Sequence, residues 1–185
     1  MKVNLRELLP MQQLVNKTVV ERLGRELFVD ELVLAFNIEL FEFFNEIGTW
    51  KWWKQNHTTD RERVLDELAD CFAFFLSIVD ISEKFDLVEK GTDVSTTEAF
   101  EQDLNSVLEK LLQNYEGEDG VIIVNGLIGM IGAENEMNET TNSIARMATA
   151  IAIVNYLYQG ITWKEISEAY YKKSEKNIER QQNNY

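Results

Sequence analysis

Four carboxylates in two pairs are the residues of this sequence best suited to chemistry. Glu39 and Glu42 form one pair and Glu67 and Asp70 the other, and three-residue spacing puts each pair on one face of a helix. Aromatic and aliphatic residues surround both pairs, so the carboxylates are expected to be largely buried and to need a counter-charge. A hard divalent cation with oxygen ligands would supply that charge, which predicts a metal site.

Acidic pairs with this spacing are also common on exposed helix faces, where they are simply solvated. For either pair alone, that interpretation is the better one. Two such pairs in aromatic-rich helices, joined by the Trp- and Lys-rich connector 49–59, favour the metal site. Lys51 and Lys54 in the connector could reach phosphates. Its tryptophans could cover a base or could equally plug the core.

Composition limits the class of protein. A chain of 185 residues is long enough for one domain with a real core. Its net charge of −14 argues against binding to nucleic acid or to an anionic membrane. The single cysteine excludes an internal disulfide and fits a reducing cytoplasm. We expect neither secretion nor membrane insertion, because no apolar run is long enough for either.

Helical periodicity and a single proline predict an all-α, multi-helix bundle. Pro10 is expected to break the first helix, which would then begin near Met11. Range 138–159 is apolar around its circumference, so we expect it at the centre of the fold or at a subunit interface. The remaining helices are expected at 28–47, 60–82, 97–115 and, after a capping box that begins at Thr162, to the end of the chain.

Segment 116–136 contains five glycines among apolar residues. It is compatible with a closely packed helix, or with a short strand followed by a helix. We treat it as a possible insertion within a single domain that spans 1–185. Its apolar content also makes it a candidate contact surface.

Together these features resemble the all-α nucleotide pyrophosphohydrolases, which comprise the dimeric dUTPases and their MazG-type relatives. The two acidic pairs resemble the metal motif of that superfamily, and 50–54 looks like its Trp/Lys loop. Segment 12–16 is similar to the N-terminal Gln/Asn segment that meets the uracil ring. Segment 170–185 resembles the C-terminal motif that closes over base and phosphates. The narrower match is to the dimeric dUTPases of phages and of some bacteria and protozoa, so a phage origin and a host cytoplasm are possible.

The resemblance implies an all-α fold and hydrolysis of dUTP to dUMP and pyrophosphate by water attack at the α-phosphorus. Two or more Mg²⁺ ions would be needed, with Mn²⁺ as a possible substitute. Glu42 would also deprotonate the water and is the predicted catalytic residue. The implied metal ligands are Glu39, Glu42, Glu67 and Asp70. The implied substrate-binding residues are Gln13, Asn16, Lys51, Trp53, Lys54, Lys173, Asn177, Arg180 and Tyr185.

Two alternatives stay open. The chain could be a broader MazG-type pyrophosphohydrolase that acts on another nucleotide such as dCTP. It could also bind a regulatory protein, with the glycine-rich segment as the contact. The resemblance further implies a homodimer, and we expect its interface to include Met147, Ile151 and Val154, or the stretch 120–132.

Overall fold

The structure is a computed structural model, and it describes residues 1–54, 58–84, 95–114, 124–126, 128 and 139–183. Within these ranges all regular structure is helical, so the predicted all-α class is confirmed. None of the described helices is both long and apolar enough to cross a membrane. The helices are α1 (Leu5–Leu23), α2 (Val29–Ile47), α3 (Arg61–Lys84), α4 (Thr96–Asn114), α6 (Glu139–Leu157) and α7 (Trp163–Gln182).

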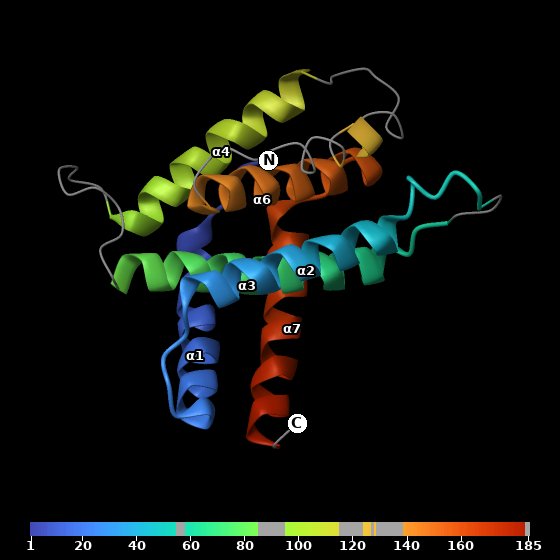
Figure 1. The fold of residues 1–185 in the computed structure, drawn as a ribbon. Coiled ribbons are helices and arrows are strands. Elements are labelled where there is room, and N and C mark those ends of the chain that lie inside the picture. Colours follow the sequence, from blue (N-terminus) through green and yellow to red (C-terminus); the bar gives the residue numbers. More distant parts are fainter. Residues whose placement is uncertain (55–57, 85–94, 115–123, 127, 129–138, 184–185) are drawn as a thin grey trace.

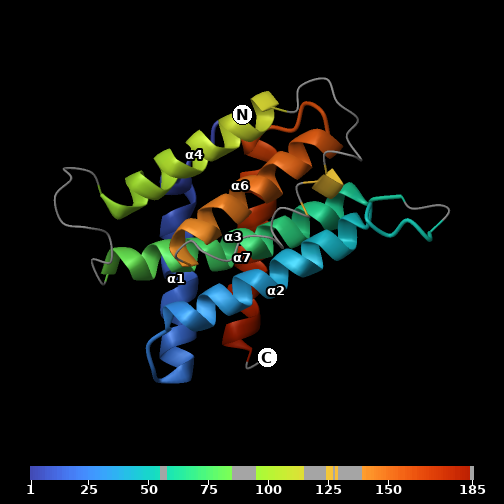
Figure 2. The ribbon, with the colours of Figure 1, turned by 45° about the horizontal axis from the view of Figure 1, so that its top comes forward.

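Helix α3 lies at the centre and contacts each of the other described helices. Helix α2 runs antiparallel beside it, α1 and α7 cross it, and α4 and α6 pack as a layer on the opposite side from the free ends of α1 and α7 (Figures 1 and 2). Phe75 of α3 marks this centre, because its ring centroid lies 6.1 Å from that of Phe36 and 6.2 Å from that of Phe100. A helix with neighbours on all sides must be apolar on most of its surface, and this explains the buried run from Phe75 to Val79.

The helix ends carry recognisable capping residues. Gly48 ends α2 with a φ of 61°, a left-handed conformation that glycine adopts without a Cβ penalty. Asp60 accepts a hydrogen bond from the backbone N–H of Glu62 at 2.9 Å at the start of α3. Thr162 and Glu165 form the predicted capping box at the start of α7.

The predicted break at Pro10 is wrong, since α1 runs without interruption from Leu5 to Leu23. Proline removes one backbone hydrogen bond inside a helix and costs about 3 kcal/mol there. Leu5, Leu8 and Leu9 are buried in the same two turns, and packing of these side chains outweighs that cost.

The predicted interface on α6 is also wrong for its named residues. Met147, Ile151 and Val154 are fully buried within the protomer, where α6 packs against α4, α3 and α2. The apolar circumference of this helix therefore reflects a central position, which was the other prediction for it. The glycine-rich segment 116–136 lies outside the described residues except for Val124–Gly126 and Ile128, as does the alternative interface 120–132.

Replacing Phe75 with Ala is expected to lower the free energy of unfolding by about 3–5 kcal/mol, because it opens a cavity where α2, α3 and α4 meet. Chemical denaturation of metal-free protein measures the change. Leu14→Ala is the matched control on an exposed side chain and should change stability by less than about 0.5 kcal/mol. Equal losses for the two variants would contradict this account of the core.

Candidate active site

A cleft of about 470 Å³ opens between α1, α2, α3 and α7, and both acidic pairs line it. This volume is in the range of small-molecule binding sites. Helix α2 contributes Glu39 and Glu42, and α3 contributes Glu67 and Asp70. The antiparallel packing of these two helices therefore brings together carboxylates that lie far apart in the sequence. The other lining residues are Gln12, Val15, Asn16, Val19, Leu27, Leu32, Ala73, Phe74, Ser77, Lys173, Asn177, Arg180 and Gln181.

Three of the four carboxylates are close enough to share one cation. One oxygen from each of Glu39, Glu67 and Asp70 lies within 4.8 Å of the other two. Glu42 lines the same cleft outside this group of three and is more exposed. Because every donor is a carboxylate oxygen, the set fits a hard divalent cation such as Mg²⁺ or Mn²⁺.

The cluster is electrostatically strained. Burial raises the pKa of Glu39 to about 7, and the nearby charges of Asp70, Glu42 and Glu67 add to the effect. Burial likewise raises the pKa of Glu67, with Asp70 as the next cause. Each of these shifts means that the folded protein disfavours a further negative charge in the cleft, which is the condition that a bound cation relieves.

Lys173 of α7 supplies an internal counter-charge at this end of the cleft. Its Nζ lies 2.6 Å from Asp70 Oδ2 and 2.5 Å from Asp66 Oδ2. Burial lowers the pKa of Lys173, but hydrogen bonds to the two carboxylates outweigh that effect and raise it. Burial still raises the pKa of Asp70, although the hydrogen bond from Lys173 opposes the shift. One ammonium group therefore neutralises only part of the cluster.

The opposite end of the cleft carries amides and a hydroxyl. Gln12 and Asn16 come from α1, and Ser77 comes from α3. Ser77 follows Asp70 by seven residues, so about 10 Å along the axis of α3 separates the acidic end from the amide end. Phe74 lies between these two positions and offers an apolar surface. The cleft thus has a region for charge and a region for a flat polar ring, separated by roughly the length of a nucleotide.

The structure brings most of the predicted site residues to this cleft. The four carboxylates, Asn16, Lys173, Asn177 and Arg180 all line it. Gln13 does not: its side chain is exposed and donates to Asp80 Oδ1 at 3.2 Å. Tyr185 lies outside the described residues.

The connector residues lie elsewhere in this protomer. Lys51 donates to the backbone oxygen of Asn45 at 2.8 Å, and Lys54 is exposed. Trp52 is 88% exposed and Trp53 is 56% exposed, so neither of them plugs the core. The connection that follows α2 runs out from the end of the α2–α3 pair, away from the body of the molecule, as Figure 1 shows.

Sequence reasoning missed Phe74 and Ser77 as lining residues. They follow Asp70 by four and seven residues, which puts all three on one face of α3. That spacing was the available signal. Gln12 was recognised only as part of a polar segment, and its place in the cleft instead of Gln13 depends on the rotation of α1 in the bundle.

Metal-free protein is expected to lose thermal stability as the pH rises from about 4.5 to about 7. Over this range folded Glu39, with a pKa of about 7, holds a proton that the unfolded chain, with the ordinary value of 4.5, has released. Unfolding then releases protons, so rising pH favours the unfolded state. Glu67 and Asp70 act in the same direction. Glu39→Gln should flatten the slope in thermal melts with chelator, and identical slopes in both proteins would contradict the assignment.

Comparison with known proteins agrees with this geometry. The family model described as dUTPase matches residues 4–185, which is nearly the whole chain and includes every element of the cleft. No curated protein matches the chain. The cleft of carboxylates, basic groups and amides suits a nucleoside triphosphate, and the match extends over all four helices that form it. This chain belongs to the dUTPase family, whose activity is the hydrolysis of dUTP.

Proposed function

We propose that the cleft hydrolyses dUTP to dUMP and pyrophosphate with the help of Mg²⁺, for which Mn²⁺ could substitute. The observation that carries the proposal is the meeting of two acidic pairs from α2 and α3 at one end of a cleft whose other end is lined with amides. The residues that would hold the cation are Glu39, Glu67 and Asp70, with Glu42 beside them. A bound divalent cation would neutralise these carboxylates and the phosphate oxygens and acidify the attacking water.

Glu42 is the proposed general base. It lines the cleft outside the group of three carboxylates, and its side chain is exposed at the open side. A carboxylate there can accept a proton from a water molecule that approaches the substrate. Its three neighbours hold the negative charge that keeps a cation nearby, so the roles of ligand and base fall on different parts of the cluster.

Lys173 and Arg180 would bind the phosphates. Both lie on α7 and line the cleft opposite the carboxylates. Lys173 is already held at the acidic end by Asp66 and Asp70, so it is positioned to meet a phosphate oxygen that enters beside them. Burial raises the pKa of Asp70, and Arg180 is close enough for its charge to oppose that rise, so it lies near the acidic end of the cleft.

The base would occupy the amide end. Asn16 lines this part of the site with a polar group, and Phe74 gives the ring an apolar surface. Asn177 of α7 lines the same cleft. Asn16 is 3% exposed, so a hydrogen bond made to it by the base is shielded from water. A site of this kind discriminates by leaving a buried polar group unpaired when the wrong base binds.

The connector and the outer face of α2 support a homodimer. Leu34, Ile38 and Phe41 recur at helical spacing and are each about half or more exposed, and Trp52 and Trp53 in the connector are exposed as well. Exposed apolar side chains gathered on one helix face are typical of an interaction site.

Replacing Glu42 with Gln is expected to keep the fold and to lower kcat by at least about a hundredfold, because the amide cannot take the proton. Pyrophosphate release from dUTP, dTTP and dCTP with and without Mg²⁺ tests the reaction and the substrate class together. Glu109→Gln, an exposed change on α4 remote from the cleft, is the matched control and should leave the rate unchanged. Equal turnover of dUTP and dTTP would contradict uracil specificity, and full activity in chelator would contradict the metal.

Replacing Phe41 with Asp is expected to convert a dimer into monomers, because a charge in an apolar interface must be buried without a partner. Light scattering at about micromolar protein measures the mass. Leu23→Asp places the same charge on an exposed residue at the end of α1 and should leave the mass unchanged. A monomeric mass for the unmodified protein would show that the dimer proposal is wrong.

A further inference from the structure

A chain of polar side chains crosses the amide end of the cleft from α7 through α1 to α3. Tyr170 Oη donates to Gln12 Oε1 at 2.8 Å, and Gln12 Nε2 donates to Asn16 Oδ1 at 3.0 Å. Asn16 Nδ2 then donates to Asp80 Oδ2 at 2.8 Å. All four side chains are buried, yet Gln12 and Asn16 also line the cleft. The chain thus connects the base end of the site to a carboxylate that lies outside it.

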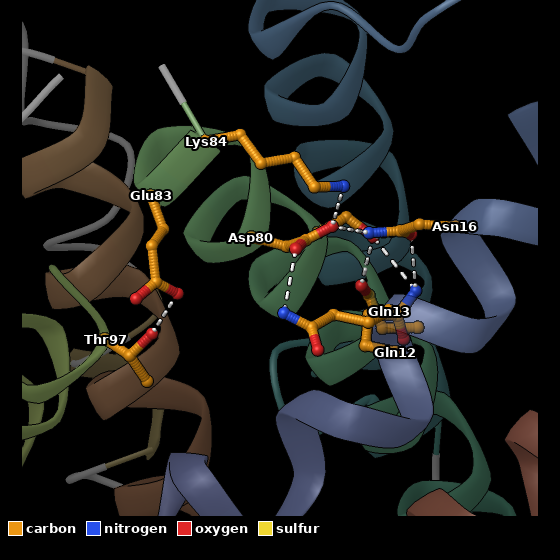
Figure 3. A network of polar contacts seen from close by, with 9 residues as sticks. Gln12, Gln13, Asn16, Asp80, Glu83, Lys84 and Thr97 are labelled. Carbon is orange, nitrogen blue, oxygen red and sulfur yellow. Dashed lines mark hydrogen bonds and ion pairs between the residues drawn. The ribbon is translucent and has the colours of Figure 1, made fainter. Parts of the chain in front are cut away.

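Asp80 is the end point of this chain. Besides Asn16, it accepts hydrogen bonds from Gln13 Nε2 at 3.2 Å and from Lys84 Nζ at 2.9 Å. Figure 3 shows Asn16, Gln13 and Lys84 converging on the Asp80 carboxylate. Asp80 is only 1% exposed, and each of its three partners can donate. All three side chains that contact this carboxylate therefore donate hydrogen bonds to it.

Asp80 also determines the direction in which the hydrogen bonds of this polar network run. Tyr, Gln and Asn side chains each donate and accept, so Tyr170, Gln12 and Asn16 could all reverse together and still pair with one another. The reversed chain would turn Asn16 Oδ1 towards the Asp80 carboxylate, where two acceptors would face each other in a buried site. That arrangement forfeits a charge-assisted hydrogen bond and adds repulsion. The carboxylate therefore holds the Asn16 amide in one orientation.

This orientation determines what Asn16 can offer to a ligand. Its Oδ1 already has Gln12 Nε2 at 3.0 Å and Ser77 Oγ at 2.8 Å. The Ser77 hydroxyl also lies 2.9 Å from the Ala73 carbonyl oxygen, so its one proton can bond either to that carbonyl or to Asn16 Oδ1. In both cases the Ser77 oxygen blocks the approach of a ligand to that side of Asn16 Oδ1. One Nδ2 proton remains after the bond to Asp80. Asn16 can donate to a base but has no open acceptor.

Gln12 is constrained in the opposite sense. Its Nε2 donates to Asn16 Oδ1 and to Ser77 Oγ, each at 3.0 Å, so this amide nitrogen is already held by acceptors of the protein itself. Its Oε1 accepts from Tyr170 and keeps one lone pair. The amide end therefore presents one donor from Asn16 and one acceptor from Gln12.

We propose that Asp80 is a positioning residue that sets the base selectivity of the enzyme by fixing Asn16 as a donor. With Asn16 fixed as a donor, the site binds a pyrimidine that has a carbonyl oxygen at C4. It excludes cytosine, because the amino group at C4 of cytosine can only donate a hydrogen bond. Gln12 Oε1 then receives the N3–H that uracil has and cytosine lacks. The inference rests on the proposed function, since it requires the base to bind at the amide end. Thymine has the same edge as uracil, so Asp80 separates these two bases from cytosine and not from each other.

The test is Asp80→Asn, which keeps the size of the side chain but gives it an N–H that can donate to a reversed Asn16. The ratio of kcat/KM for dUTP to kcat/KM for dCTP is expected to fall about tenfold or more, mainly through opposite changes in the two KM values. Loss of structure alone would lower both kcat/KM values together and leave the ratio unchanged. An unchanged ratio in a variant that still hydrolyses dUTP would overturn the proposal.

Two further variants keep the test decisive. Glu101→Gln is the matched control, because Glu101 is a buried carboxylate that accepts from Arg6 away from the cleft, and its ratio should equal that of the unmodified enzyme. Ser77→Ala opens one side of Asn16 Oδ1 and should lower the ratio several-fold even if Asp80→Asn folds poorly. An unchanged ratio for Ser77→Ala would also contradict the proposal. Failure of the unmodified enzyme to release pyrophosphate from dUTP with Mg²⁺ would instead refute the proposed function itself.

Discussion

Mutual repulsion of the carboxylates in one cleft is the constraint on which the rest of the structure depends. Side chains that raise one another's pKa can stay together only on rigid supports, and here the supports are α2 and α3, packed along their length. Lys173 offsets part of the repulsion from a third helix. The repulsion in the site therefore lowers the stability of the fold, and a bound cation together with a phosphate chain would restore that stability.

Helix α3 belongs both to the core and to the wall of the cleft, and this explains its composition. It is the centre of the core through Phe75 and a wall of the cleft through Asp70, Phe74 and Ser77. A helix that packs on every side has little room for polar groups, and a buried charge on it needs donors around it. Asp80 illustrates this, since it is buried and accepts from three donors. Core packing and ligand recognition are thus built from alternate faces of the same element.

The sequence predicted what depends on local spacing and failed where the outcome depends on how helices are rotated in the bundle. Periodicity gave the helices, and three-residue spacing brought out the two acidic pairs. Gln12 and Gln13 point about 100° apart around the axis of α1, and the packing of α1 in the bundle decides which of them faces the cleft. The apolar circumference of α6 is the same whether its neighbours belong to one chain or to two. Asp80 gave no signal, because a single acid in an apolar run reveals its partners only in three dimensions.

The placement of both ends of the cleft on one unbroken helix has a consequence for how this enzyme can evolve. The helical rise alone separates Asp70 from Ser77, so α3 sets a fixed distance between the acidic end and the amide end of the cleft. Insertion of one residue between them would turn everything beyond it by about 100° and shift it by about 1.5 Å. No loop is available there to absorb such a change. Substitution can alter what the cleft recognises, but insertion or deletion in this stretch would move its amide end out of line with its acidic end.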